Sequence, residues 1–304
     1  MGRPKVAKAG NQMQDVITLI GNEFRPKTAR FAAILGLTPS KGARSPVLWN
    51  AAYEAAGDDA SMVPMDVTEA NLPALVDALR ADSRCLGGAV AVPHKQGLLP
   101  LLDHLEPEAA RIGAVNSVYR HADGGLVGAN TDGAGALTEI TDLVGGAEEL
   151  ARRRAVVLGL GGAGLAVAAY LAAGVSDLAL ANRTQATAAA AAQRLGARSI
   201  DWPVAEDDLA NCDLVVNCST IGFADGPAGS PLAAGALAAL PATAAVYDVI
   251  YQPRETPLLA AARARGLSAR DGLGMNLEQA VIAFDKTNPG LLQRSRLRQV
   301  MADA

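Results

Sequence analysis

Three polar side chains stand where short apolar runs of the sequence end. Lys95, Asn116 and Asp132 each follow small apolar residues that read as a strand stopping at a polar turn. Strand ends that gather at one edge of a sheet would bring an ammonium, an amide and a carboxylate together. Such a set of groups could form the floor of a site for a hydroxylated substrate.

Lys95 and Asp132 also suggest a proton relay. Oxidation of an alcohol requires removal of the hydroxyl proton as hydride leaves the carbon, and the reverse reaction requires its return. A lysine can relay this proton, and a carboxylate beside it fixes the position of the ammonium group. A purely structural salt bridge between a strand end and a helix start remains the alternative.

A glycine-rich run further along the chain supplies a candidate reaction. Gly159, Gly161 and Gly164 follow the apolar strand expected at 155–158 and precede an apolar helix expected at 165–173. In such a loop the first glycine permits a tight turn, the second lets the backbone approach a pyrophosphate, and the third lets helix and strand pack closely. The run therefore predicts a bound dinucleotide, and with it hydride transfer.

The end of the next expected strand bears on which dinucleotide is bound. An NAD site usually has an acidic residue there, but this chain has Asn182, Arg183 and Thr184. A guanidinium forms charge-assisted pairs with phosphate, so these residues favour the 2′-phosphate of NADP. NAD stays possible as the cofactor.

Composition excludes several other classes of function. The chain has 304 residues, 50% of them hydrophobic, which suits about two globular domains. The formal net charge is −4 without a basic stripe, so nucleic acid is not an expected partner. No apolar run is long enough for a membrane span, and the three cysteines have no spacing that suits zinc or a redox pair. We expect a cytoplasmic protein with reduced thiols, no membrane partner and no metal site.

The order of apolar runs predicts an α/β protein. Its first half reads as strand–helix–strand–helix–strand, which indicates a mostly parallel sheet, followed by a hairpin around 123–125. Ser45 is expected to cap the first helix and Gly57 to end it. The expected strands are 31–37, 60–63, 89–92, 114–119, 126–129, 155–158, 178–181, 214–217 and 245–250, and the expected helices include 45–56, 72–81, 186–195, 275–286 and 291–301.

The N-terminal segment is expected to lie outside this fold. Residues 1–14 are polar and basic and lack the apolar core of a secretory signal. We expect residues 1–20 to form a disordered or tag-like lead.

Taken together, these motifs resemble the shikimate/quinate dehydrogenase family from about Phe31 to Asn288. The resemblance is specific because the pieces occur in the same order along the chain. They are Ser45-Pro46, Val92-Pro93-His94-Lys95, Gly113-Ala114-Val115-Asn116-Ser117, Asn130-Thr131-Asp132, the glycine run at 159–164, Asn182-Arg183-Thr184, Asn217-Cys218-Ser219-Thr220-Ile221-Gly222, Asp248-Val249-Ile250-Tyr251, Thr256-Pro257-Leu258, Gly274-Met275 and Gln279.

The resemblance implies an organisation and a set of roles. The substrate domain would span 21–133, with the C-terminal helices 275–304 packed on it, and a Rossmann-like NAD(P) domain would span 134–274. The site would lie between the two domains. The resemblance makes Lys95 and Asp132 catalytic. It implies substrate binding by Ser45, Asn116, Tyr251 and Gln279, and cofactor binding by Gly159, Gly161, Gly162, Ala163, Gly164, Asn182, Arg183, Thr184, Thr220 and Gly274.

The chain also departs from the family pattern where hydrogen-bonding groups are expected. Ala43, Ala89 and Ala91 replace a serine, an asparagine and a threonine, and two of these lost groups would normally contact a substrate carboxylate. Each lost hydrogen bond to a charged group costs ~1.5–3 kcal/mol, so two losses would weaken binding by roughly 10²–10⁴-fold. Replacement donors are available nearby in the sequence. They are Thr38, Ser40, Lys41 and Arg44, of which Arg44 could pair with a carboxylate through two nitrogens.

Three functions remain open on the sequence. The first is an NADP-dependent dehydrogenase acting on a shikimate-like cyclic polyol acid, as a monomer or homodimer. The second is a quinate-type dehydrogenase that uses NAD. The third is a non-catalytic ligand-binding relative, which would have no need for the pair Lys95 and Asp132.

Overall fold

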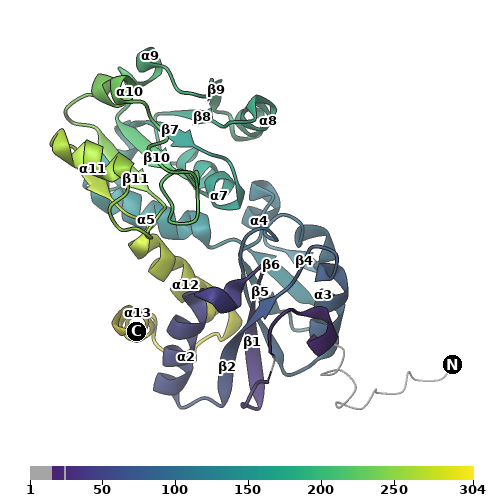
Figure 1. The fold of residues 1–304 in the computed structure, drawn as a ribbon. Coiled ribbons are helices and arrows are strands. Elements are labelled where there is room, and N and C mark those ends of the chain that lie inside the picture. Colours follow the sequence, from purple (N-terminus) through teal and green to yellow (C-terminus); the bar gives the residue numbers. More distant parts are fainter. Residues whose placement is uncertain (1–15, 24) are drawn as a thin grey trace. The chain divides into compact units, whose positions relative to one another are not determined.

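The computed structural model describes residues 16–23 and 25–304. The chain divides into two compact units (Figure 1). One, here called the N-terminal unit, joins the residues up to Thr131 with Ala280–Ala304, and the other, the central unit, is Asp132–Gln279.

The expected lead at 1–20 lies mostly outside the described residues, which begin at Val16. The part that is described belongs to the fold. Val16 is 1% exposed, and Leu19 and Ile20 pack against the same apolar core. The prediction of a disordered lead is therefore wrong for 16–20, because these side chains are buried by the sheet that follows.

A six-stranded mixed sheet forms the N-terminal unit, in the order β2-β1-β3-β5-β6-β4. Its strands are β1 (Arg30–Gly36), β2 (Ala60–Asp66), β3 (Cys85–Val90), β4 (His104–Leu105), β5 (Ser117–Arg120) and β6 (Leu126–Ala129). The pairs β1–β2, β1–β3 and β4–β6 are parallel, whereas β3–β5 and β5–β6 are antiparallel. The expected hairpin is confirmed as the β5–β6 pair.

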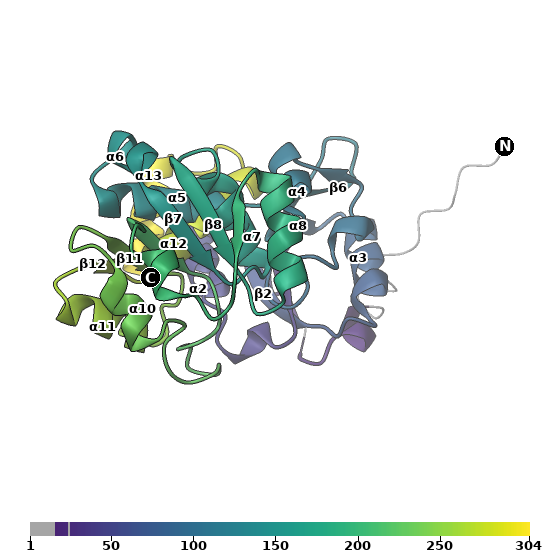
Figure 2. The same cartoon turned by 90° about the horizontal axis from the view of Figure 1, so that it is seen from above.

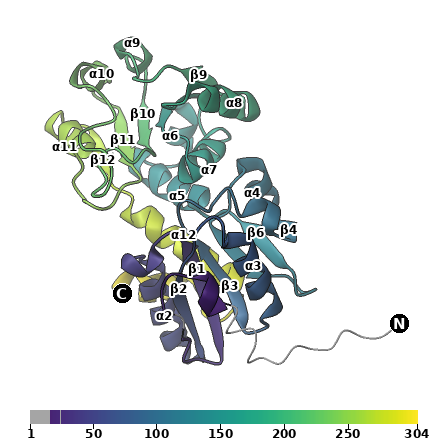
Figure 3. The same ribbon diagram turned by 45° about the vertical axis from the view of Figure 1, so that its right-hand side comes forward.

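Helices cover both faces of this sheet (Figure 3). They are α2 (Ser45–Ala56), α3 (Leu72–Ala81), α4 (Pro107–Ile112), the end of α12 (Leu273–Thr287) and α13 (Arg294–Asp303), with 3₁₀ turns η1 (Pro39–Lys41) and η2 (Leu99–Leu101). On the α3 face, Leu75 and Leu79 share a core with Phe31. On the α2 face, the Trp49 ring lies 5.1 Å from the Phe284 ring of α12, centroid to centroid.

The start of α2 differs from the expectation. Arg44, not Ser45, is the N-cap, and its backbone already has helical angles (φ −77°, ψ −28°) without a side-chain cap. Residues 42–44 separate the turn η1 from the helix. Because the backbone is already helical at Arg44, Ser45 falls inside the first turn, where a hydroxyl does not cap. The end is as predicted: Gly57 adopts the left-handed conformation (φ +64°).

A six-stranded, fully parallel sheet forms the central unit, in the order β12-β11-β10-β7-β8-β9 (Figure 2). Its strands are β7 (Arg154–Leu158), β8 (Asp177–Ala181), β9 (Arg198–Ile200), β10 (Leu214–Asn217), β11 (Ala245–Asp248) and β12 (Ser268–Arg270). Counted along the chain this is the order 3-2-1-4-5-6 of a dinucleotide-binding fold, whose ligands bind where the order reverses. Here the reversal lies between β7 and β10.

The helices of the central unit, besides the start of α12, are α5 (Asp132–Val144), α6 (Ala147–Arg152), α7 (Gly162–Leu171), α8 (Gln185–Leu195), α9 (Glu206–Leu209), α10 (Ala234–Ala239) and α11 (Pro257–Ala264). Of these, α7 and α8 were predicted as the helices at 165–173 and 186–195. The α/β class is confirmed, whereas the short elements α6, α9, α10, β9 and β12 escaped prediction because they span too few residues to show a period. In the described part of the chain, no helix is long and apolar enough to cross a membrane.

Candidate active site

Lys95 lies in the turn that follows β3 and is partly buried. The backbone carbonyl of Lys95 accepts a hydrogen bond from the Val115 N–H at 2.7 Å. The loop after β1 also reaches this turn, since the Leu37 N–H donates to the Val92 carbonyl at 3.3 Å. Lys95 is thus fixed at the edge of the N-terminal sheet where β1 and β3 end.

Asn116 occupies the same edge and joins β3 to β6. Its carbonyl accepts from the Val90 N–H at 2.8 Å, and its own N–H donates to the Ala129 carbonyl at 3.1 Å. The buried amide also binds Thr131: Oδ1 accepts from the Thr131 N–H at 2.7 Å, and Nδ2 lies 2.9 Å from the Thr131 Oγ1. One row of hydrogen bonds therefore links the turn of Lys95, through Asn116, to the residue that precedes Asp132.

Asp132 is the first residue of α5 and is 4% exposed. A carboxylate at this position is favoured by the positive end of the helix dipole. Two glycines next to it let α5 approach its neighbours closely. A Cβ at Gly133 would lie 2.3 Å from the Tyr170 ring of α7, and one at Gly135 would lie 3.0 Å from the Gln279 N atom of α12. The start of α5 is thus packed against the glycine-loop helix and the helix that carries Gln279.

The glycine loop has the geometry that the sequence predicted. Gly159 has φ +88°, and a Cβ there would lie 2.8 Å from the Ser219 backbone. A Cβ at Gly164 would lie 2.0 Å from the Gly159 carbonyl oxygen, whereas the space around Gly161 is open for 4 Å. Gly159 joins β7 to the loop and Ser219 follows β10, so the loop lies at the reversal point of the sheet. The residues therefore fit a bound pyrophosphate at the start of α7.

These distances predict different outcomes for two alanine substitutions. We expect Gly164→Ala to destabilise the protein by about 1–3 kcal/mol, because its Cβ overlaps the Gly159 carbonyl. We expect Gly161→Ala to leave stability within about 0.5 kcal/mol of wild type but to weaken dinucleotide binding, because its methyl group occupies the phosphate approach. Thermal unfolding and fluorescence titration measure the two effects separately. Dinucleotide affinity at the wild-type level in Gly161→Ala would show that the phosphates lie elsewhere.

Asn182 has a role in this loop that the sequence did not indicate. Its Oδ1 accepts from the Leu160 N–H at 3.0 Å, and its Nδ2 donates to the Thr184 carbonyl at 3.2 Å. Asn182 thereby ties the glycine loop to the turn after β8. Arg183 and Thr184 on this turn are exposed and available to a ligand.

A buried network connects three of the sequence motifs of the central unit. Asp248 accepts hydrogen bonds from the Asn217 amide at 2.9 Å, the Thr256 hydroxyl at 2.8 Å and the Ile250 N–H at 3.1 Å. Burial raises the pKa of Asp248 to about 6, although these donors oppose the shift. The network fixes the turn that carries Tyr251. Asp248, Asn217 and Thr256 were parts of sequence motifs, but the sequence did not indicate that they bind one another.

The remaining predicted residues are placed as follows. Tyr251 and Gln279 are partly buried, and the Gln279 Nε2 donates to the Asn276 carbonyl at 2.9 Å. Thr220 is exposed in the loop after β10. Gly274 lies against Glu139, since a Cβ there would be 2.2 Å from its carboxylate. Gly162 and Ala163 form the first turn of α7, and Ser45 is partly buried at the start of α2.

The chain is similar in sequence to known proteins. The family model for the shikimate dehydrogenase substrate binding domain matches residues 37–118. The shikimate dehydrogenase (NADP(+)) of Paramagnetospirillum magneticum strain AMB-1 is 41% identical over 262 residues, which cover 84% of this chain and 92% of that protein. The chain belongs to the shikimate dehydrogenase family.

Two solved structures are similar to this shikimate dehydrogenase family member along most of the chain. Shikimate 5-dehydrogenase from Thermus thermophilus, in complex with NADP(H) and shikimate, is 32% identical with a TM-score of 0.76 and covers 90% of this chain and 99% of its own. The 5-ketofructose reductase of Gluconobacter sp. strain CHM43, in a ligand-free form, is 30% identical with a TM-score of 0.75 and covers 92% and 99%. The expected family, its α/β fold and its oxidoreductase class are confirmed.

His94 and Cys218 lie beside motif residues of this family member, but both are packed against other parts of the protein. His94, beside Lys95, is 1% exposed, and its Nε2 lies 2.8 Å from the Val67 carbonyl. Cys218 is partly buried beside Gly164, and burial raises the pKa of its thiol well above its usual range. We therefore assign neither a proton-transfer role to His94 nor a nucleophilic role to Cys218.

Among the residues that the structure describes, one cluster formed by β4 and the β5–β6 turn could hold a metal ion. The ligand atoms of His104, His121 and Asp123 lie within 4.8 Å of one another, and all three residues are exposed. Asp123 already pairs with both imidazoles, at 3.0 and 3.1 Å. The Gly125 N–H and then these histidines lower its pKa to about 2. These contacts account for the cluster without a metal, and the absence of a metal site stays a prediction.

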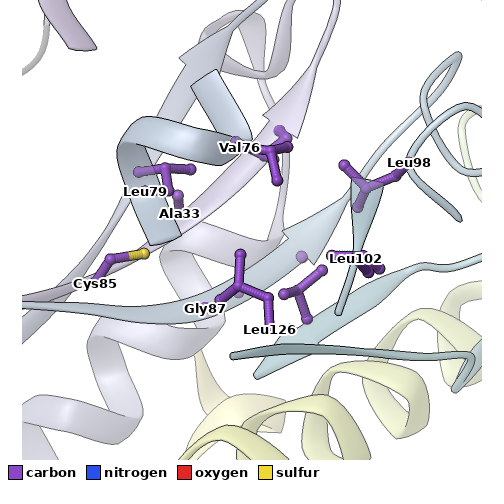
Figure 4. Close-up of a pocket in the computed structure, with 12 residues that line it drawn as sticks. Ala33, Val76, Leu79, Cys85, Gly87, Leu98, Leu102 and Leu126 are labelled. Carbon is purple, nitrogen blue, oxygen red and sulfur yellow. The ribbon is translucent and has the colours of Figure 1, made fainter. Parts of the chain in front are cut away.

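Two cavities among the described residues of the N-terminal unit differ in size and lining. The first holds about 20 Å³ and is lined by apolar side chains of α3 and the sheet, among them Val76, Leu79 and Leu126 (Figure 4). It is a gap in the core and is unsuited to a polar ligand. The second holds about 400 Å³ and is lined on one side by Thr38, Lys41 and their neighbours. None of the predicted site residues lines either cavity.

Proposed function

We propose that this protein transfers hydride between NADP(H) and a hydroxyl or keto group of a shikimate-like cyclic polyol acid. The single observation that supports this most is the hydrogen-bonded row from the turn of Lys95 through Asn116 to Thr131. Asp132, the residue after Thr131, begins α5, and this helix packs against the helix of the glycine loop. The arrangement would use the N-terminal unit for the substrate and the central unit for the dinucleotide.

In this proposal each residue of the chain has a defined task. The glycine loop and the turn after β8 would hold the dinucleotide, whose oxidised nicotinamide would supply the acceptor for the hydride of the substrate carbon. The neutral amine of Lys95 would take the proton from the substrate hydroxyl, and Asp132 would hold in position the ammonium that forms. Asn116 and Gln279 would bind ring hydroxyls, and Ser45 and Tyr251 would lie at the carboxylate end.

The cofactor assignment rests on the loop and on the turn after β8. The open space at Gly161 admits phosphate to the first N–H groups of α7. The exposed Arg183 guanidinium and the Thr184 hydroxyl suit a 2′-phosphate. We therefore propose NADP as the preferred cofactor, with NAD as the weaker one.

A second candidate is reduction of a neutral keto sugar. Ala43, Ala89 and Ala91 lack polar groups of the family pattern, two of which are expected at a carboxylate, and one structural neighbour is named a 5-ketofructose reductase. Loss of carboxylate binding would suit an uncharged substrate. The reaction type and the roles of Lys95 and Asp132 would be unchanged.

A substrate panel tests these functions directly. Purified protein is mixed with NADP⁺ or NAD⁺ and shikimate, quinate or aminoshikimate, and in the reverse direction with NADPH and 5-ketofructose, while the absorbance of the reduced nicotinamide is followed. Turnover of a cyclic acid with NADP⁺ is the expected result. Turnover of 5-ketofructose alone would establish the second candidate. No turnover in any mixture, with dinucleotide still bound, would contradict both and favour a non-catalytic relative.

A further inference from the structure

The turn that carries Lys95 reaches across the end of β1 to the end of β2. The strands lie in the order β2-β1-β3, and Lys95 comes after β3 (Figure 3). His94, the residue before Lys95, places its Nε2 2.8 Å from the carbonyl oxygen of Val67, which follows β2. The side chain of His94 therefore links the ends of the two strands that flank β1.

This bond closes a ring of contacts at the edge of the sheet. The Val67 N–H donates to the carbonyl of Gly36, the last residue of β1, at 2.8 Å. The Leu37 N–H donates to the Val92 carbonyl at 3.3 Å, and Val92 lies two residues before His94. The three strand ends are thereby fixed to one another, and the turn after β3 is fixed with them.

The backbone of His94 makes bonds of another kind. Its N–H donates to the Ala91 carbonyl at 3.1 Å, and its carbonyl accepts from the Leu98 N–H at 2.9 Å. Both bonds lie within the turn, and any residue other than proline at position 94 can make them. They maintain the shape of the turn, whereas the bond of the side chain joins the turn to another strand and so determines where it lies.

The imidazole of His94 has a single polar partner among the described residues. A carbonyl oxygen only accepts, so Nε2 carries the hydrogen in the bond to Val67. The other ring nitrogen, Nδ1, is buried and has no hydrogen-bond partner. An unsatisfied buried nitrogen is unfavourable, and an apolar side chain would fill the same space without it. What the imidazole adds at this position is therefore the bond to Val67.

We propose that His94 is a positioning residue, which holds the turn of Lys95 against β1 and β2 so that the lysine amine meets the substrate hydroxyl. The inference rests on the proposed function and adds a residue that acts through Lys95, since His94 is only 1% exposed. Proton transfer requires close placement of the two groups, and a displacement of about 1 Å can lower a rate by about 10²-fold.

The test compares three replacements of His94. In His94→Gln the amide nitrogen can occupy the place of Nε2 and donate to the Val67 carbonyl, whereas His94→Asn is too short to reach it and His94→Met has no donor. We expect kcat to fall about 10–100-fold in His94→Asn and His94→Met, and less than about threefold in His94→Gln. The KM for NADP⁺ should stay within about twofold of wild type in all three, because the glycine loop belongs to the central unit.

Leu79→Ala controls for a loss of stability that leaves the turn in place. Leu79 is buried beside Cys85, the first residue of β3, and so lies at the other end of this strand from Lys95 (Figure 4). The cavity left by the substitution should lower the midpoint of thermal unfolding, but kcat should stay within about twofold of wild type.

Three results in an active enzyme would overturn the inference and leave the proposed function intact. They are a kcat within about twofold of wild type in a folded His94→Asn or His94→Met, a His94→Gln as slow as His94→Met, and an equal loss of kcat in Leu79→Ala. Should His94→Met not fold, His94→Asn alone serves for the comparison with His94→Gln. A wild type that turns over no substrate of the panel would remove the proposed function and this inference with it.

Discussion

Replacement of Lys95 by methionine should lower kcat by about 10³-fold, the typical contribution of a positioned acid–base group. Methionine has a similar length and suits a partly buried position, but it cannot accept or return the proton of the substrate hydroxyl. The turn itself should persist, because it is held by the bond from the Val115 N–H to the Lys95 carbonyl, which any residue can make. The measurement is the initial rate of nicotinamide reduction at saturating substrate.

Two further measurements show whether the loss concerns chemistry. The dissociation constant for NADP⁺ should change by less than about twofold, because the glycine loop belongs to the central unit. Lys41→Met, an exposed lysine of the neighbouring loop, should keep the wild-type rate. A Lys95→Met enzyme that retains more than about a tenth of the wild-type kcat would exclude lysine as the proton relay.

The sequence predicted the elements whose signal is local. Strand and helix patterns of adequate length were found, and Gly57, Gly159 and Gly164 were predicted correctly because a turn or a close approach requires glycine. Ser45 was predicted wrongly as a cap because the backbone is already helical at Arg44, which a preference for serine at caps does not show. Each of these outcomes depends on a few consecutive residues.

The parts of the candidate site that escaped prediction depend on distant residues. The amide of Asn116 binds Thr131, and Asp248 binds both Asn217 and Thr256, so these contacts appear only when strands are paired. The hydrogen bond from His94 to the Val67 carbonyl likewise joins residues that are distant in sequence. Motif spacing therefore indicated which residues matter, whereas three-dimensional pairing indicated what several of them do.

The contact made by Gly133 also involves residues distant in sequence, and replacement of this glycine should greatly lower the stability of the protein. In sequence it is a small residue after Asp132, but in the structure it is where α5 contacts α7. A Cβ there would lie 2.3 Å from the Tyr170 ring and 2.7 Å from the Ala166 carbonyl oxygen. A rotation of the tyrosine could relieve the first overlap, but the backbone oxygen of Ala166 could move only with its helix.

We therefore expect Gly133→Val to destabilise the protein by at least ~3 kcal/mol, since the two helices must separate to admit the side chain. Adding Tyr170→Ala should restore only part of the stability, because the overlap with the Ala166 oxygen persists. Thr138→Val, an exposed position on the same helix, controls for a β-branched residue in α5 and should unfold within about 0.5 kcal/mol of wild type. Urea unfolding followed by circular dichroism measures all three variants. Full recovery in the double variant would mean that the tyrosine alone limits the space, and that α5 and α7 can pack without glycine at this contact.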